Sequence, residues 1–192
     1  MGRRRVRQPV IVSVLALAVS LGSACLAHSQ SKSQEYRIEA TYLSNFGKFV
    51  HWPVAASKEP NFVICIMGSD PFGKTLDVAV AGEKINNQNV ITRRISTPQE
   101  APACRIVFIS VSEANRLTEI LDDLDKASIL TVSNMPGFTA NGGMIQFVLM
   151  KDKVRFEVNM AATNAAKLTL SSQLLKVAAS IKREPEPGEK PQ

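Results

Sequence analysis

One segment of the chain matches a nucleotide-binding motif. Residues 68–75, Gly-Ser-Asp-Pro-Phe-Gly-Lys-Thr, satisfy the phosphate-loop pattern G-x-x-x-x-G-K-[ST] and follow an apolar, strand-like run. A phosphate loop aims consecutive backbone N–H groups at an anion, whereas Pro71 removes one donor and Asp70 adds a negative charge. No apolar run ends in the acidic residue that a magnesium site requires. We therefore interpret the segment as the start of a capped helix and keep nucleotide hydrolysis as a third hypothesis.

The histidines and aspartates offer little for catalysis or metal binding. His28 lies in a predicted leader, which leaves His51 as the single imidazole of the mature protein. Metal sites built on several imidazoles are thereby excluded. No sharp nucleophile turn accompanies His51, which we expect to face solvent at a helix end. Asp122, Asp123 and Asp125 lack the glycine and distal glutamate of a calcium loop and should form a solvated helix face. We expect no metal, no cofactor and no catalytic residue.

One carboxylate differs from its neighbours in a predicted strand. Glu157 lies between Phe156 and Val158, so its side chain points away from these apolar residues. Lys153 and Arg155 lie close by in the same strand. Two interpretations stay open: an exposed carboxylate paired with a lysine elsewhere, or a residue that recognises a partner.

The positive charge is concentrated at the amino terminus. The formal net charge of the 192 residues is +6, no acidic residue precedes Glu35, and four arginines stand at positions 3, 4, 5 and 7. The excess therefore says little about nucleic acid, which we do not expect as a partner. With 45% hydrophobic and 21% charged residues, the composition is that of an ordinary soluble domain. Collagen, coiled coil and wholesale disorder are excluded.

Residues 1–27 have the three-part organisation of a secretory signal peptide. A basic start precedes an apolar run from Val10 to Leu21 and small residues up to Ala27. The apolar run is too short to cross roughly 30 Å of hydrocarbon, so we expect export without a permanent membrane span. Two alternatives stay open. One is lipid attachment at Cys25, although Gly22 stands where a lipoprotein signal has a Leu-like residue. The other is twin-arginine export.

Two cysteines remain in the folded part, Cys65 and Cys104, in a compartment that oxidises thiols. We expect a disulfide that closes a loop of about 40 residues and stabilises the fold by roughly 4 kcal/mol on the chain-entropy model. Cys65 lies in one strand-like run and Cys104 opens another. The bond would therefore join two strands of one sheet, or a strand to its neighbour's lead-in. The alternative is two buried free thiols.

The apolar periodicity of the first half predicts a helix followed by alternating strands and helices. Apolar residues at three- and four-residue steps predict a helix from Glu35 to Trp52, which Pro53 ends, with the indole folded back on the helix end. The expected elements that follow are a strand over 61–67, a helix capped by Asp70 that ends at Gly82, a polar strand over 89–95, a loop over 97–103, a strand over 106–109 and a helix capped by Ser112 that ends at Asp125.

The second half predicts a hairpin and further helices. The expected elements are a strand over 129–132, a loop over 133–143, an antiparallel hairpin of 144–150 and 153–159 that turns at Lys151 and Asp152, a helix over 160–166 capped by Asn159, and a helix capped by Ser171 or Ser172 with Leu174, Leu175, Val177, Ala178 and Ile181 on its inner side. This order predicts an α/β fold, a three-layer mixed sheet of mostly parallel strands plus a C-terminal antiparallel hairpin, with helices on both faces. We expect one domain over residues 34–182 and a flexible tail over 183–192.

Several of these segments together resemble the YfiR-like periplasmic repressors. The matching pieces occur in the same order: YLSNFGKFVHWP (42–53), ICIMGSDPFG (64–73), ILTVS (129–133), GGMI (142–145), VRFEVN (154–159) and LLKVA (174–178). The resemblance implies a periplasmic regulator, not an enzyme, that binds the outer part of an inner-membrane diguanylate cyclase and represses it. Cyclic di-GMP signalling and biofilm formation are thereby restrained. It also implies that an outer-membrane lipoprotein can draw the repressor away.

The resemblance carries over to individual residues. Cys65 and Cys104 match the family's first cysteine pair, whose redox state influences competence, and Glu157 matches a carboxylate linked there to inhibition. Glu157 is therefore the expected partner-binding residue. A second cysteine pair of some members would fall at Thr139 and Gln146, so redox control here would act on a single bond. We also allow for a homodimer, and keep a periplasmic small-molecule-binding sensor module as the alternative function.

Overall fold

The computed structural model describes residues 32–53, 59–125 and 127–183. Residues 32–49 are helical, and the described residues from Tyr36 onward belong to one compact unit. The predicted signal peptide over 1–27, the lipid-attachment candidate Cys25 and residues 184–192 of the predicted tail lie outside the described residues. Within the described ranges, no helix has both the length and the apolar character needed to span a membrane.

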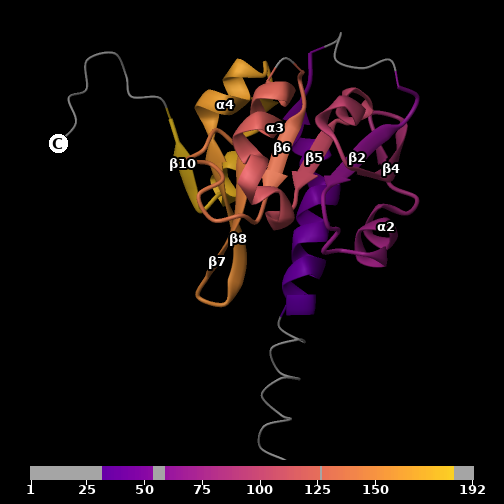
Figure 1. Ribbon diagram of the computed structural model, residues 1–192. Coiled ribbons are helices and arrows are strands. Elements are labelled where there is room, and N and C mark those ends of the chain that lie inside the picture. Colours follow the sequence, from indigo (N-terminus) through magenta and orange to yellow (C-terminus); the bar gives the residue numbers. More distant parts are fainter. Residues whose placement is uncertain (1–31, 54–58, 126, 184–192) are drawn as a thin grey trace, which may run out of the picture. The chain divides into compact units, whose positions relative to one another are not determined.

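An eight-stranded mixed sheet forms the centre of the unit (Figure 1). Its strands, in spatial order, are β10 (Ser180–Lys182), β8 (Lys153–Asn159), β7 (Ile145–Met150), β6 (Leu130–Ser133), β5 (Ile106–Ile109), β2 (Phe62–Met67), β4 (Gln88–Ile95) and β3 (Lys84–Ile85). The neighbours from β4 through β2, β5 and β6 to β7 are parallel, whereas β7–β8 and β3–β4 are antiparallel. Every residue of β2, β5 and β6 is buried, as expected for parallel strands covered on both faces.

Helices cover both faces of this sheet. On one face, residues 36–49, α2 (Lys74–Val80) and α5 (Ser172–Val177) pack against alternate residues of the strands, and α4 (Met160–Ala165) contributes Met160 and Ala162. On the other face, α3 (Leu117–Leu124) and the 3₁₀ segment η1 (Pro98–Ala103) cover the remaining residues. Figure 1 shows α3 lying across β5 and β6. The predicted three-layer α/β fold is confirmed.

An aromatic cluster attaches the helix of residues 36–49 to the β7–β8 hairpin. The ring centre of Phe46 lies 5.3 Å from that of Phe156 and 5.8 Å from that of Phe147. Tyr42 packs edge-on against Phe156 at 5.4 Å. The next residue after Phe46, Gly47, lets the helix approach the sheet, because a Cβ there would come within 2.7 Å of the Phe62 ring. Aromatic packing at Phe46 and the close approach that Gly47 allows therefore both hold the helix against the sheet.

The hairpin and the caps of the second half follow the sequence closely. Lys151 and Asp152 have φ values of 49° and 58°, the positive values that a two-residue type I′ turn requires. Asn159 accepts the N–H of Ala162 at the start of α4, and Ser171 accepts the N–H of Leu174 at the start of α5. These predicted elements are confirmed.

The predicted end of the first helix was wrong. Helical residues stop at Phe49, and Val50–His51 form β1, which pairs antiparallel with β9 (Thr169–Leu170). Pairing with a distant segment overrides the helical periodicity there, and the N–H of Ser171 donates to the carbonyl of Phe49 at 2.8 Å. The indole of Trp52 packs edge-on against Phe62 of β2 at 5.3 Å instead of on the helix end. His51 is exposed, as expected, but lies in a strand.

Two other helix starts were also wrong. α2 begins at Lys74, and the carboxylate of Asp70 caps a preceding turn by accepting the N–H groups of Phe72 and Gly73. Ahead of α3, Ser110 rather than Ser112 caps a 3₁₀ segment, η2 (Val111–Arg116). In both cases a tight turn stands where we expected the first α-helical turn. The turn directly follows a buried parallel strand, β2 in the first case and β5 in the second.

Three shorter differences concern segments with weak periodicity. The expected loop over 97–103 contains η1, and Asn86 and Asn87, with φ values of 51° and 64°, form the turn of an unpredicted β3–β4 hairpin. In the last helix, the expected inner-face residue Val177 is 50% exposed, and Ile181 lies in β10.

A disulfide joins Cys65 of β2 to Cys104, which precedes β5, with the Cα atoms 5.9 Å apart. Both residues are buried in the cluster beneath α3 and η1. The bond therefore ties a strand to the lead-in of its neighbour and holds η1 against the sheet.

Removing this bond should destabilise the fold by the same amount whichever of the two cysteines is replaced. The loop spans 39 residues, so Cys65→Ala and Cys104→Ala should each lower the free energy of unfolding by about 4 kcal/mol, because the unfolded chain regains loop entropy. The double variant should cost about as much as either single variant, since only one bond is lost. Urea denaturation measures the change, with dithiothreitol-reduced wild type as the control. Two titratable thiols in the native protein would contradict the bond.

Candidate functional site

The phosphate-loop lookalike directs its backbone donors into the protein. Its N–H groups already have acceptors: Ser69 donates to the hydroxyl of Ser112, Phe72 and Gly73 donate to the carboxylate of Asp70, and Thr75 donates to the carbonyl of Phe72. An anion cradle needs these groups free and convergent. The segment is therefore a strand-to-turn connection in which Lys74 is an exposed residue.

One arginine fastens this turn to the neighbouring strand. The guanidinium of Arg94 in β4 lies 2.8 Å from the carboxylate of Asp70 and 2.6 Å from that of Asp77 in α2. A further Arg94 N–H donates to the carbonyl of Gly73 at 2.9 Å. The hydrogen bond from Arg94 is the main reason that the pKa of Asp77 is held below its ordinary value, against a smaller opposing effect of desolvation. The network is a structural clamp around the turn.

The predicted partner-binding residue lies on the opposite face of β8 from the aromatic cluster. Glu157 is half-buried, and its register partners are Gln146 of β7 and Ser180 of β10. Its carboxylate forms no hydrogen bond or ion pair with any residue of the described ranges. The nearby Arg155 donates to the carbonyl of Val177 instead, at 3.2 Å. Pairing with a lysine elsewhere, one of the two expectations, does not occur within the described residues.

Thr139 connects the loop before the hairpin to this same face. Its N–H donates to the side-chain carbonyl of Gln146 at 3.2 Å, its carbonyl accepts from Asn159 at 3.0 Å, and its hydroxyl accepts from Lys182 at 3.1 Å. The resemblance described above implies a second cysteine pair of some family members at Thr139 and Gln146. Hydrogen bonds thus hold the loop where a second disulfide is absent.

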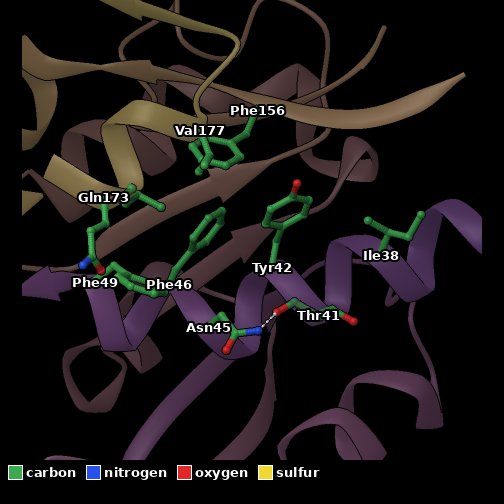
Figure 2. Close-up of a pocket in the computed structure, with 10 residues that line it drawn as sticks. Ile38, Thr41, Tyr42, Asn45, Phe46, Phe49, Phe156, Gln173 and Val177 are labelled. Atoms are coloured by element: carbon green, nitrogen blue, oxygen red, sulfur yellow. Dashed lines mark hydrogen bonds between the residues drawn. The ribbon is translucent and has the colours of Figure 1, made fainter. Parts of the chain in front are cut away.

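A groove opens between the first helix and α5, with a volume of about 670 Å³. Figure 2 shows Tyr42, Phe46 and Phe49 of the helix facing it, with Phe156 of β8 and Val177 of α5 on the other side. The residues that face it are mostly apolar, and Ile38 and Val177 at its edges are 37% and 50% exposed. A cavity of this size and character suits an apolar molecule of moderate size.

The sequence missed this groove because its residues have the same spacing as core residues. Tyr42, Phe46 and Phe49 belong to the apolar stripe of the first helix, and Leu174 and Val177 belong to that of α5. The space between the two stripes is a property of the tertiary structure, which their spacing in the sequence does not show. The predicted site residues are likewise not brought together: Cys65 and Cys104 lie under α3, Glu157 lies on β8, and the groove lies on the other face of β8.

The Asp77–Arg94 pair should make stability depend on pH in the acidic range. The folded-state pKa of Asp77 is lower than its ordinary value of 3.8, so the pair stabilises the fold above that pH, and this contribution is lost as the pH falls through the folded-state pKa. Asp77→Asn should lower the free energy of unfolding at pH 6 by up to about 1 kcal/mol, because the pair is partly exposed.

At pH 3, the difference between Asp77→Asn and wild type should be smaller. Thermal unfolding midpoints at the two pH values measure this change, with the exposed Asp122→Asn of α3 as the matched control. A difference that stays constant between pH 6 and pH 3 would contradict the assignment.

Two solved structures are similar to parts of this chain. A conserved domain protein from Vibrio cholerae O1 biovar El Tor is 8% identical, with a TM-score of 0.48, over 62% of this chain and 54% of that chain. The ABC domain from Streptococcus pneumoniae in complex with L-Trp is 11% identical, with a TM-score of 0.51, over 74% of this chain and 60% of that chain. The chain thus spans between half and two thirds of the length of both structures, and the second likeness concerns the fold alone.

Sequence comparison gives a more specific result. Among the curated proteins no match is found. The model of a family described as YfiR/HmsC-like matches residues 36–179, nearly the whole compact unit that begins at Tyr36. The match contains the first helix, the sheet from β2 to β8 and the groove between the helix and α5. The chain therefore belongs to the YfiR/HmsC-like family.

Proposed function

We propose that the protein is a periplasmic regulator that binds the outer part of an inner-membrane diguanylate cyclase and holds the enzyme inactive. Membership in the YfiR/HmsC-like family over residues 36–179 carries the proposal, because that family is periplasmic and regulatory rather than catalytic. The leader predicted over residues 1–27 would deliver the chain to the same compartment. Repression by contact would restrain cyclic di-GMP and biofilm formation. The proposal also includes two finer parts: an outer-membrane lipoprotein draws the regulator away from the cyclase, and the regulator forms a homodimer.

Glu157 is the residue that we assign to the contact with the cyclase. A half-buried carboxylate without a partner in the described chain has already lost part of its hydration and gains little from its own fold. An arginine or a backbone N–H of the partner would restore the missing hydrogen bonds. Contacts of this kind fix the register of an interface, because a wrong partner leaves the charge unpaired.

Glu157→Gln tests this assignment, since it removes the charge and keeps the shape. We expect at least about tenfold weaker binding to the purified periplasmic domain of the cyclase, the loss typical of a hydrogen bond to a charged group. Deleting the gene should raise cyclic di-GMP, and Glu157→Gln should fail to restore the low level. The matched control is Glu119→Gln on the exposed side of α3, which should restore it. Unchanged cyclic di-GMP after deletion, in a strain that retains the cyclase, would contradict the proposal.

The groove favours a second candidate function, that of a sensor for a small apolar molecule. Its volume of about 670 Å³ lies within the range of ligand pockets, and aromatic rings from the helix and from β8 line it. The ligand would lie against the half-buried Tyr42 and Phe49, with the buried rings of Phe46 and Phe156 behind them. Sensing through the groove would therefore not require reduction or oxidation of the Cys65–Cys104 disulfide.

A charge placed at the groove edge tests this second function. The dye 1-anilinonaphthalene-8-sulfonate should bind the native protein with a saturable rise in fluorescence. Val177→Asp should weaken that binding at least tenfold, because the charge must then be desolvated beside the dye. Val78→Asp is the matched control, since Val78 is 74% exposed on α2 and does not line the groove. Equal binding to both variants would exclude the groove as the ligand site.

A further inference from the structure

A second, smaller cavity lies at the amino ends of β2 and β5. Its volume is about 230 Å³, and its lining includes His51, Trp52, Phe62, Asn86, Gln88 and Arg105. Trp52 and Phe62 form an aromatic wall, with their rings edge to face at 5.3 Å. Asn86 belongs to the β3–β4 turn, and Gln88 donates to the carbonyl of Glu59 at 2.6 Å. Polar and aromatic groups from distant parts of the sequence thus meet at one end of the sheet.

Arg105 brings an uncompensated positive charge to this cavity. Its Nη1 is buried and has no hydrogen-bond partner, and its guanidinium forms no ion pair with any described residue. The guanidinium lies over the ring of Trp52, with Cζ 6.0 Å from the ring centre. Burial lowers the pKa of Arg105, yet an arginine keeps its proton in proteins. A buried charge of this kind destabilises a fold unless an anion pairs with it.

The backbone holds Arg105 firmly in this position. Its N–H donates to the carbonyl of Val63 at 2.8 Å, and its carbonyl accepts from Leu130 at 2.9 Å. The preceding residue, Cys104, is fixed by the disulfide to Cys65. The side chain is therefore anchored at its base from both neighbouring strands and from the adjacent bond. Arg105 is half-buried with its Nη1 enclosed, and a guanidinium placed in this way is suited to recognise an anion.

A second donor without a partner lines the same cavity. The indole Nε1 of Trp52 is also buried and makes no hydrogen bond. An indole N–H can only donate, and so can a guanidinium. The two groups therefore require acceptor atoms, and no aspartate or glutamate lines the cavity in the part of the chain that the structure describes. Residues 54–58, which follow Trp52 and Pro53, contain no acidic residue either.

We propose that this cavity binds a small oxyanion whose oxygens accept hydrogen bonds from Arg105 Nη1 and Trp52 Nε1. An ordered water could satisfy one donor but would leave the guanidinium charge unpaired, whereas a carboxylate or phosphate satisfies both requirements. A volume of about 230 Å³ admits a small acid or inorganic phosphate. This site is separate from the groove and from Glu157, and it does not depend on the cyclase.

The protein contains its own reporter for this site, because Trp52 is the one tryptophan of the chain. The mature, oxidised protein is titrated with sodium acetate and, separately, with inorganic phosphate, at ionic strength held constant with chloride. The indole ¹H–¹⁵N resonance and the fluorescence of Trp52 are followed. We expect a saturable downfield shift of the indole proton with at least one of the two anions. A response to acetate assigns the site to carboxylates, and a response to phosphate assigns it to phosphates.

Arg105→Met separates binding from a structural role. The variant keeps an unbranched, mostly apolar side chain and removes the charge together with the N–H donors, so binding should weaken at least tenfold while the thermal midpoint stays equal or rises. Arg93→Met, at an exposed position of β4, is the matched control and should keep the full response. Arg105→Lys retains the charge without the planar fork and should bind with intermediate affinity.

Two results would overturn the proposal. One is an indole resonance that does not move when either anion is added up to roughly 10⁻² M. The other is an Arg105→Met or Arg105→Lys variant that responds as wild type does. If Arg105→Met does not fold, Arg105→Lys and Trp52→Phe replace it. For Trp52→Phe the Arg105 Nε–H resonance serves as the reporter, and its anion-induced shift should fall at least threefold.

Discussion

Packing of the first helix against the β7–β8 hairpin is the interaction on which the functional surfaces depend. Phe46 and Phe156 are almost completely buried against each other, and Tyr42 and Phe147 extend the cluster. Burying each of these rings stabilises the fold by roughly 2 kcal/mol or more. The same helix then forms one wall of the groove and continues into β1 and Trp52, beside the smaller cavity. One packing contact therefore positions both cavities.

Much of the fold could be predicted from the sequence because local chemistry determines it. The buried runs of β2, β5 and β6 are apolar throughout, and a strand of that kind needs cover on both faces. The caps by Asn159 and Ser171 and the Lys151–Asp152 turn also depend on residues within a few positions of one another. The short strands β1 and β10 could not be predicted, because each is extended only through pairing with a distant segment. Helical periodicity favoured the wrong structure at both places.

The sites were harder to predict than the fold, since contacts between distant residues create them. In the sequence, Arg105 is a basic residue between two apolar ones and nothing marks it as a binding residue. Its proposed role depends on contact with the ring of Trp52, which lies 53 positions earlier in the chain. The rule that ligands bind at the carboxyl ends of parallel strands directs attention to the other end of the sheet. Conversely, residues 68–75 have the letters of a phosphate loop, but Asp70 takes two of the N–H groups that a phosphate would need. The direction of the backbone donors, rather than the motif, decides what such a loop can bind.

The positions of the three surfaces determine how they can influence one another. Phe156 lines the groove and Glu157 follows it directly, on the opposite face of the same strand, so β8 is the element that a ligand and a partner would share. Strand β8 is paired on one side with β7 over six residues and on the other with β10 over three residues, so it lies next to the edge strand of the sheet. Arg105 directly precedes β5 in the centre of the sheet and is joined through Cys104 to the disulfide. The disulfide is thus adjacent in sequence to the smaller cavity, whereas the groove lies against the strand that carries Glu157.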